Sequence, residues 1–236
     1  MTVLSAIQSA AVRCIGTRPT SIFSAADQFA AEMADLVNEA AIDIAKAHDW
    51  QRLMKLHTIS GDGTTEAFAL PADYDRMPVV SNLYSTRSQL PLARVRDLDQ
   101  WLEFDVTPVV GYPGYWLLLS GQIQIKPPLN PAEDVKMYYL TRNIFAGDKA
   151  RADIDADEFL LPERLLTLAL IWRWKAMKRL DYGEDMQNYS MALSEAAGKE
   201  KGSRILRVGR ARAGGAMAYP GQITGSGFDT GYDGGF

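Results

Sequence analysis

Hydrophobic positions recur at steps of three and four residues in the first part of the chain, which is the pattern of amphipathic helices. Residues 2–15 predict a first helix, with Thr2 placed to cap its start and Gly16 placed to end it. A much longer helix is predicted from about Ala25 to Leu53, with acidic side chains on the faces that the apolar stripe leaves open.

The same helical period returns near the other end of the chain. Pro162 is a favourable residue for a first turn, and a broad apolar face follows it as far as Leu180. A last helix is predicted over residues 184–197, with Gly198 at its end. Four helices with apolar stripes would bury them economically as a four-helix bundle.

Between these helices the hydrophobic period changes to two, which predicts short strands. Gly61-Asp62-Gly63 and Ser120-Gly121 are each expected to join two neighbouring strands as a hairpin, and a short helix is expected over residues 97–104. The strands are predicted at residues 55–60, 66–70, 78–84, 89–95, 115–119, 122–126 and 135–140. Closely spaced strands without long helices between them favour an antiparallel unit.

The predicted fold class is therefore α+β, with a four-helix bundle interrupted by an antiparallel β insertion and followed by an extended C-terminal arm. We expect residues 1–56 and 150–198 to form the helical body and residues 57–149 to form the β-rich insertion. Residues 199–236 would form the arm.

The composition of the arm is unlike that of the rest of the chain. Residues 198–236 contain 11 of the 19 glycines, and residues 199–236 carry six basic and three acidic side chains. So much glycine with so few aliphatic side chains does not favour independent folding, so we expect order only on a partner. The candidate contact residues are Arg204, Arg207, Arg210, Arg212, Tyr219, Phe228, Tyr232 and Phe236.

Charge separates the arm from the body. The chain has a formal net charge of −4, whereas residues 1–198 alone carry 19 basic and 26 acidic side chains. A basic arm on an acidic body indicates an acidic partner for the arm. An acidic body argues against nucleic-acid binding by the protein as a whole.

Motifs for catalysis, metal binding and membrane insertion are missing. Cys14 is the only cysteine, and it lies on the apolar side of a predicted helix, as a buried inert thiol would. His48 and His57 lack zinc-ligand spacing, and neither a phosphate-binding glycine loop nor a nucleophile motif is present. We expect no enzyme activity and no cofactor. No signal-peptide pattern opens the chain and its apolar runs are too short for a membrane span, so we expect synthesis in the cytoplasm.

Two features imitate functional motifs. Asp153, Asp155 and Asp157 resemble the start of a calcium loop, but the later positions of that motif are wrong, so a solvated acidic loop is the favoured interpretation. Trp172 and Trp174 could form a stacking platform with a neighbouring tyrosine, but their helical spacing is more typical of a core or an interface.

One ordered series of weak motifs resembles a known family. The series consists of His48-Asp49-Trp50-Gln51-Arg52-Leu53, Leu70-Pro71-Ala72-Asp73-Tyr74, the Tyr115–Ile125 hairpin, Lys126-Pro127-Pro128, Met137-Tyr138-Tyr139, Asp157-Glu158-Phe159-Leu160-Leu161-Pro162-Glu163 and the helix with Trp172 and Trp174. This order, over roughly residues 20–210, resembles the head-to-tail adaptor proteins of tailed bacteriophages, the group that includes podovirus tail tubular protein A.

The resemblance implies a structural virion protein in the phage neck. Such a subunit would join a ring, typically twelvefold, that binds the portal protein through C-terminal arms and meets the tail nozzle or tail tube below. Double-stranded DNA would pass through the channel of the ring without specific binding, and no membrane would be involved. The alternatives are another tail component, such as a nozzle or tail-completion protein, and a wall-degrading hydrolase, which no motif favours.

Overall fold

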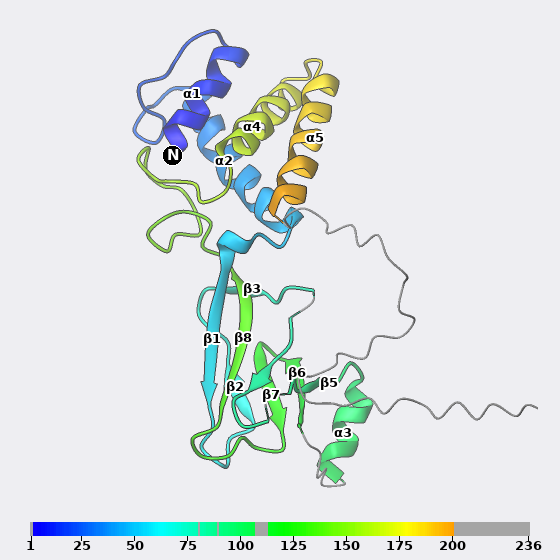
Figure 1. The fold of residues 1–236 in the computed structure, drawn as a ribbon. Helices are drawn as coiled ribbons and strands as arrows, with labels where there is room; N and C mark the ends of the chain where they lie inside the picture. Colours follow the sequence, from blue (N-terminus) through cyan, green and yellow to red (C-terminus); the bar gives the residue numbers. More distant parts are fainter. Residues whose placement is uncertain (1, 80, 89, 107–112, 201–236) are drawn as a thin grey trace, which may run out of the picture. The chain divides into compact units, whose positions relative to one another are not determined.

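The computed structural model describes residues 2–79, 81–88, 90–106 and 113–200. They belong to a compact unit that spans residues 1–202, and the fold below is the fold of that unit. Its architecture is mixed α+β, as predicted, with five α-helices among the described residues and sheets in which antiparallel pairing predominates (Figure 1).

We divide the elements into two sets for description. The helical module consists of α1 (Val3–Cys14), α2 (Gln28–Ala47), α4 (Glu163–Met177) and α5 (Gly183–Glu200). The β module consists of β1 (Met54–Ser60), β2 (Ala67–Ala69), β3 (Tyr74–Arg76), β4 (Tyr84–Ser85), β5 (Ala93–Arg94), α3 (Leu98–Val106), β6 (Tyr115–Leu119), β7 (Gln122–Lys126) and β8 (Asp134–Thr141). A single 3-10 turn, η1 (Gln51–Leu53), leads from α2 into β1.

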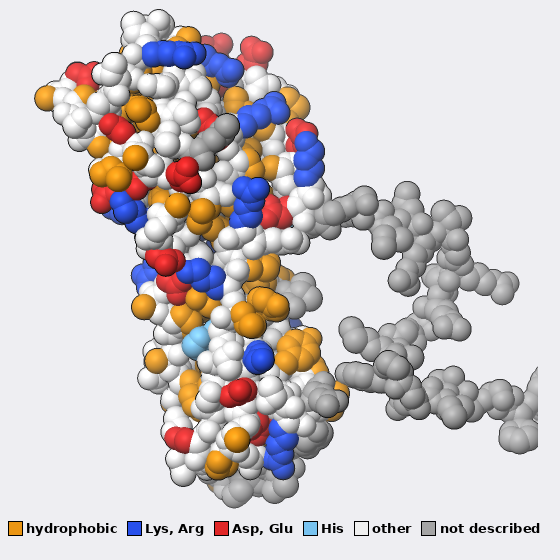
Figure 2. Space-filling view, turned by 60° about the vertical axis from the view of Figure 1, so that its left-hand side comes forward, with side chains coloured by type: hydrophobic (Ala, Val, Ile, Leu, Met, Phe, Trp, Pro, Cys, Tyr) orange, Lys and Arg blue, Asp and Glu red, His pale blue; other side chains and the backbone are white. Residues whose placement is uncertain are grey.

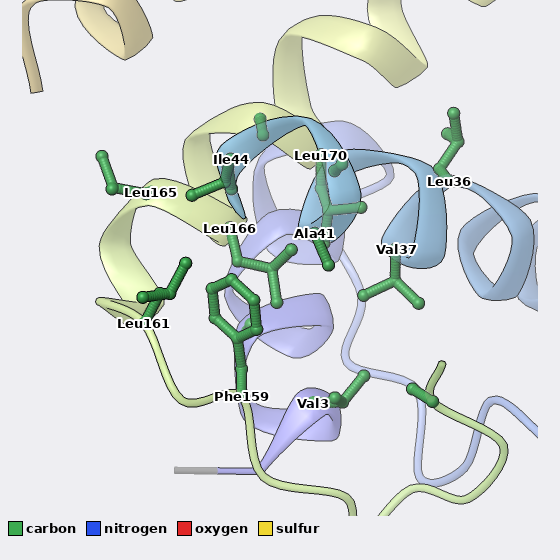
Figure 3. Packing of buried hydrophobic residues seen from close by; sticks show 14 of the residues in the cluster. Val3, Leu36, Val37, Ala41, Ile44, Phe159, Leu161, Leu165, Leu166 and Leu170 are labelled. Carbon is green, nitrogen blue, oxygen red and sulfur yellow. The ribbon is translucent and has the colours of Figure 1, made fainter. Parts of the chain in front are cut away.

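The helix α4 is central to the helical module, because it packs against α1, α2 and α5. Residues 165–171 are all buried, which is typical of a helix enclosed by protein. Figure 3 shows Leu166 and Leu170 of α4 among Val37 and Ala41 of α2 and Phe159 from the segment before α4. These contacts establish one central helix with three neighbours, and the stricter description as a four-helix bundle stays a prediction.

The first helix follows its sequence signals closely. The Thr2 hydroxyl accepts a hydrogen bond from the backbone N–H of Ser5 at 3.3 Å, so the predicted cap is confirmed. Gly16 follows the helix with a φ of +74°, a left-handed conformation that favours glycine. The predicted end of this helix is therefore also confirmed.

The helix α2 is shorter than the predicted range of residues 25–53. It ends at Ala47, after which the chain is extended before it enters η1. Trp50 explains this end, because its fully buried indole donates a hydrogen bond from Nε1 to the carbonyl oxygen of Ile44 at 2.7 Å. That bond satisfies a carbonyl group in the last turn, and it requires the chain to fold back along the helix.

The last two helices also depart slightly from their predicted ends. The helix α4 stops before Leu180, because Arg179 adopts a φ of +57° that a helix cannot contain. The helix α5 continues through Gly198 to Glu200, so the predicted end at Gly198 is wrong. Gly198 is exposed in this helix, and its conformation is compatible with continuation.

The β module contains two sheets. In the first sheet, β8 lies between β1 and β3 and also pairs with β4; in the second, the order is β2-β7-β6-β5. The predicted hairpin of β6 and β7 is confirmed, with Ser120 and Gly121 at φ values of +52° and +74°. Positive φ at both central residues is the requirement of the type I′ turn that suits a two-residue hairpin.

The predicted hairpin at Gly61-Asp62-Gly63 is wrong. β1 pairs with β8 in the first sheet, whereas β2 pairs with β7 in the second, so this turn carries the chain from one sheet to the other. Gly61 is required by a close approach, because a Cβ there would lie 2.5 Å from the carbonyl oxygen of Asn130. Asp62 then accepts hydrogen bonds from the amides of residues 64 and 65 and turns the chain away from β1.

Among the described residues of the strands predicted at 78–84 and 89–95, the strands are limited to Tyr84–Ser85 and Ala93–Arg94, with one isolated bridge between Tyr84 and Pro91. The strand Tyr74–Arg76 was not among the predicted strands. These short strands depend on pairing with β8 and β6, which are distant in sequence, so alternation alone places them poorly.

The β module has three layers, and alternate side chains of β6 connect them. Trp116 points into the core between the two sheets, whereas the next residue, Leu117, points to the other side of the second sheet. There it packs with Val95 and with Trp101 of α3, whose indole Nε1 donates to Gln124 Oε1 at 3.0 Å. The layer order is therefore first sheet, second sheet, α3 (Figure 1).

Candidate assembly surfaces

The eight predicted arm residues, from Arg204 to Phe236, lie outside the described residues. The structure does show how the chain is held just before them. Glu200 Oε1 accepts a hydrogen bond from the backbone N–H of Gln51 at 2.8 Å, and Lys199 pairs with Glu195 across the last turn of α5 at 2.6 Å. These contacts fix the point from which the arm starts.

An open groove of about 610 Å³ lies beside this point. Its walls carry Arg52, Arg164 and Lys199 together with Glu195 and Glu200. Both acids are already engaged, one with Lys199 and the other with the backbone of η1. Both carboxylates therefore help to hold the last turn of α5 in place.

The acidic loop before α4 is structural. Asp155 accepts hydrogen bonds from the Ser21 hydroxyl at 2.6 Å and from the backbone N–H groups of residues 22 and 23. It therefore ties this loop to the connector before α2. Asp157 is buried and accepts from Lys149 at 2.9 Å and from the amides of residues 153 and 154. Burial raises the pKa of Asp157, but these hydrogen bonds outweigh it and bring the pKa to about 2. The prediction of a solvated loop is therefore wrong for Asp155 and Asp157.

Potential metal ligands and nucleophiles are likewise engaged in packing. Throughout the described ranges, His, Cys, Asp and Glu side chains do not come together in threes to hold a metal ion. His48 packs edge-on against Trp50, and His57 packs edge-on against Tyr139. Cys14 is half-buried and not fully buried as predicted, and burial raises the pKa of its thiol to about 11, which leaves it a weak nucleophile at neutral pH.

The tryptophans of α4 point in different directions. Trp174 is buried in the helical core and donates from Nε1 to Glu32 of α2 at 3.1 Å. Trp172 is half-buried and lies 6.4 Å from Tyr182 and 6.2 Å from Tyr189, measured between ring centroids. The two indoles therefore serve separate contacts and do not form a stacking platform.

A network of cations on α4 neutralises the acidic face of α2. Arg173 bonds to Glu39 at 2.5 Å and also to Asp43, and Lys178 bonds to Glu32 at 2.6 Å. On the face viewed in Figure 2, basic and acidic side chains lie beside one another with hydrophobic side chains between them.

The junction of the two modules is a dense polar site. Arg76 of β3 donates from one terminal nitrogen to the carbonyl oxygens of Ala45 at 3.1 Å and His48 at 2.9 Å, and its Nε donates to Asp49 at 3.2 Å. It therefore caps the C-terminal end of α2 with a cation, which also suits the helix dipole.

A second polar group at the junction centres on Asp73, which accepts hydrogen bonds from Lys55, Tyr139 and Thr141 at 2.8–2.9 Å. Burial raises the pKa of Asp73, but these bonds outweigh it and bring the pKa to about 2. Lys55 also pairs with Asp148, and its bonds to Asp148 and Asp73 raise its own pKa. The Arg76 group therefore fixes the β module on α2, whereas the Asp73 group holds β1, β8 and the loop after β8 together. The sequence positions of these residues did not reveal either role.

Two outer surfaces of the β module expose clustered apolar side chains. On α3 these are Leu98, Leu102 and Val106, which repeat at intervals of four residues. On the outer face of the first sheet they are Leu56, Tyr84 and Tyr138, from three neighbouring strands. The four-residue spacing of the apolar side chains on α3 was visible in the sequence. Whether these side chains are exposed depends on which face of the helix Trp101 holds against the second sheet.

Several charged side chains of the described residues thus hold parts of the chain together, and two apolar clusters face outward. Comparison with protein families defines the class of protein: the chain belongs to the SU10 adaptor protein family, which matches residues 1–219. The protein is accordingly a phage structural adaptor, a virion component that associates with other head–tail proteins. The finer resemblance to podovirus tail tubular protein A stays a prediction.

A search of curated proteins finds no match to this chain. Within the described residues, the longest apolar helices fall short of what a membrane span requires.

Proposed function

We propose that this chain is the subunit of a head-to-tail adaptor ring that binds the portal protein, connects it to the tail and extends the DNA channel. The observation that carries the proposal is the family match, which spans the described body and the cationic segment that contains Arg204, Arg207, Arg210 and Arg212. The ring is twelvefold in this proposal, and the tail nozzle or tail-tube protein docks below it.

The arm makes the portal contact. Its arginines follow one another every two or three residues, too closely for one side of a helix, and this spacing suits an extended segment in an acidic groove. Guanidinium groups pair with carboxylates through two parallel hydrogen bonds, which gives such a groove specificity as well as attraction. Tyr219, Phe228, Tyr232 and Phe236 add apolar contacts along the same partner.

The body forms the ring and its channel. Residues 1–56 and 150–198 act as the helical body, residues 57–149 as the β-rich insertion and residues 199–236 as the arm. The excess of acidic over basic side chains in residues 1–198 repels phosphate, so double-stranded DNA passes through the ring without specific binding. This role requires no catalysis, cofactor or membrane.

The test is to mix the purified protein with its portal protein and to weigh the complex by native mass spectrometry. We expect about twelve copies on each portal ring, and removal of residues 203–236 should abolish attachment while the helix content of the body is retained. The absence of any complex at micromolar concentrations, with a folded protein and a folded portal ring, would refute the proposal.

A further inference from the structure

The helix α3 is apolar on two sides, and one of these sides has no partner among the described residues. Trp101 is 4% exposed and holds α3 on the second sheet. Leu98, Leu102 and Val106 are 53%, 60% and 84% exposed and form a stripe on a different side of the helix. Single exposed leucines are common on protein surfaces, but an aligned row of three along one helix is typical of a contact surface.

The opposite layer of the module carries a matching surface, which we call the sheet face and define as Leu56, Tyr84, Lys136 and Tyr138. Leu56 and Tyr138 are direct partners in the register of β1 and β8, and Tyr84 is the direct partner of Lys136. All four are exposed, and along β8 Lys136 and Tyr138 alternate with Val135, Met137 and Tyr139, which are buried. Direct partners in neighbouring strands place their side chains on the same face, so these residues form one patch.

The layer order prevents the two surfaces from meeting within one chain. The stripe lies beyond the second sheet, and the sheet face lies on the outside of the first sheet, with the core between them. A second copy of the chain can bring them together. Two different surfaces on opposite layers then make a head-to-tail contact, the kind of contact that generates closed rings.

Charge favours the same pairing. Asp99 and Glu103 are exposed on α3 next to the stripe, whereas Lys136 is exposed in the middle of the sheet face. An apolar centre with opposite charges at its edges is the usual composition of a specific interface.

We propose that the stripe of Leu98, Leu102 and Val106 on one subunit packs on the sheet face of the next subunit, with Asp99 and Glu103 beside Lys136. This contact specifies how neighbouring subunits of the proposed ring meet, and it rests on the proposed function. It identifies the β module as the part of each subunit that touches its neighbour.

The first test disrupts the apolar contact. Leu102→Asp should lower the association constant between subunits at least about tenfold, because it removes a leucine from the contact and places a charge there. Leu180→Asp is the matched control, since Leu180 is also an exposed leucine but lies in the helical module. Sedimentation equilibrium would report association, and circular dichroism with urea unfolding would show that each variant is folded.

The second test uses charge reversal, which distinguishes a specific contact from general damage. Glu103→Lys and Lys136→Glu should each weaken rings, whereas an equimolar mixture of the two variants should restore them. When the two variants alternate around the ring, each contact joins either two wild-type charges or two reversed charges, and both pairs are attractive; contacts between copies of the same variant stay repulsive, so alternation is favoured. Failure of the mixture to recover, with each single variant weakened, would overturn the assigned pairing.

The third test is a cross-link. In a Cys14→Ala background, Leu102→Cys with Tyr138→Cys should form disulfide-linked ladders of several subunits on mild oxidation, and either cysteine alone should give at most dimers. If wild-type rings assemble on the portal but the ladder is absent and Leu102→Asp assembles normally, the subunits meet elsewhere and only this interface is wrong. If wild-type protein forms no ring at all, the proposed function fails and the interface fails with it.

Discussion

The cap that Arg76 places on α2 should be the main polar contribution to holding the two modules together. Its side chain makes three hydrogen bonds to the last turn of α2 and to Asp49, and it is only 29% exposed. Arg76→Met keeps the aliphatic stem and removes these three hydrogen bonds, together with the bond that the other terminal nitrogen donates to Asp75 at 2.8 Å. We expect it to lower the free energy of unfolding by about 2–3 kcal/mol, since each net hydrogen bond contributes about 0.5–1.5 kcal/mol and the carbonyl of Ala45 is left unpaired in a buried position.

The assay is urea unfolding followed by tryptophan fluorescence and circular dichroism at a protein concentration where the subunit is monomeric. With a slope of about 3 kcal/mol per molar urea, the loss corresponds to a midpoint lower by about 0.7–1 M. Arg76→Lys should recover only part of the loss, because an ammonium group cannot reach two carbonyls and a carboxylate as the planar guanidinium does.

Arg87→Met is the matched control, because the Arg87 side chain is 63% exposed and lies 4.0 Å from its carboxylate partner, Glu133. An exposed and distant ion pair of this kind contributes little, so this variant should change stability by less than about 0.5 kcal/mol. If Arg76→Met were no more costly than Arg87→Met, or if Arg76→Lys matched the wild type, the capping role assigned to Arg76 would be refuted.

Three further predictions concern the core, the acidic loop and the arm. Leu166→Ala should lower the free energy of unfolding in urea by about 3–5 kcal/mol, because Leu166 is fully buried. Leu180 is exposed, so Leu180→Ala should lower it by less than about 0.5 kcal/mol. Equal effects would mean that the packing of α4 is misplaced. Asp157 has a folded pKa near 2, below its unfolded value of about 3.9. Its contribution to the free energy of unfolding is therefore complete above about pH 5 and is lost as the pH falls toward 2. Asp157→Asn should flatten the acid side of the stability–pH curve, and an unchanged curve would contradict this. Replacing the four arginines at positions 204, 207, 210 and 212 with serine should abolish portal attachment in native mass spectrometry while the body stays folded; normal docking on empty portal with loss of DNA from filled heads would instead assign these arginines to nucleic acid.

The elements that the sequence predicted well are those that local interactions decide. The helices α1, α4 and α5 follow three- and four-residue periods, and the hairpin of β6 and β7 follows from a two-residue turn. Each of these signals acts within a few residues of the chain, so it can be read without knowledge of distant partners.

The elements that were misplaced depend on distant contacts. Nothing near Gly61 shows that β1 pairs with β8, because the partner strand begins only at Asp134. The early end of α2 depends on Trp50 and on Arg76, and the latter approaches from the β module. A helix period that continues past such a point overestimates the helix, since tertiary contacts override the local preference.

The candidate surfaces also differ in whether local sequence or distant contacts reveal them. Composition alone singled out the arm, whereas the sheet face required the register of β1, β4 and β8, which places Leu56, Tyr84 and Tyr138 on one side. Alternation of apolar and polar residues would have assigned these three side chains to a core. Only the pairing shows that the inner face of that sheet is already filled, by Ile59, Val135 and Met137.

The proposed arrangement separates two contacts that assembly needs. The β module supplies the subunit–subunit contact, while the arm of residues 199–236 supplies the contact with the portal. Each contact can then be weak on its own, because a ring of subunits presents many arms at once and raises their effective concentration at the portal. A subunit that loses the stripe on α3 should still bind portal, but singly and weakly, whereas a subunit that loses the arm should still associate with its neighbours. The two classes of variant therefore fail at different steps, and only a protein in which one surface served both contacts would show the same defect for both.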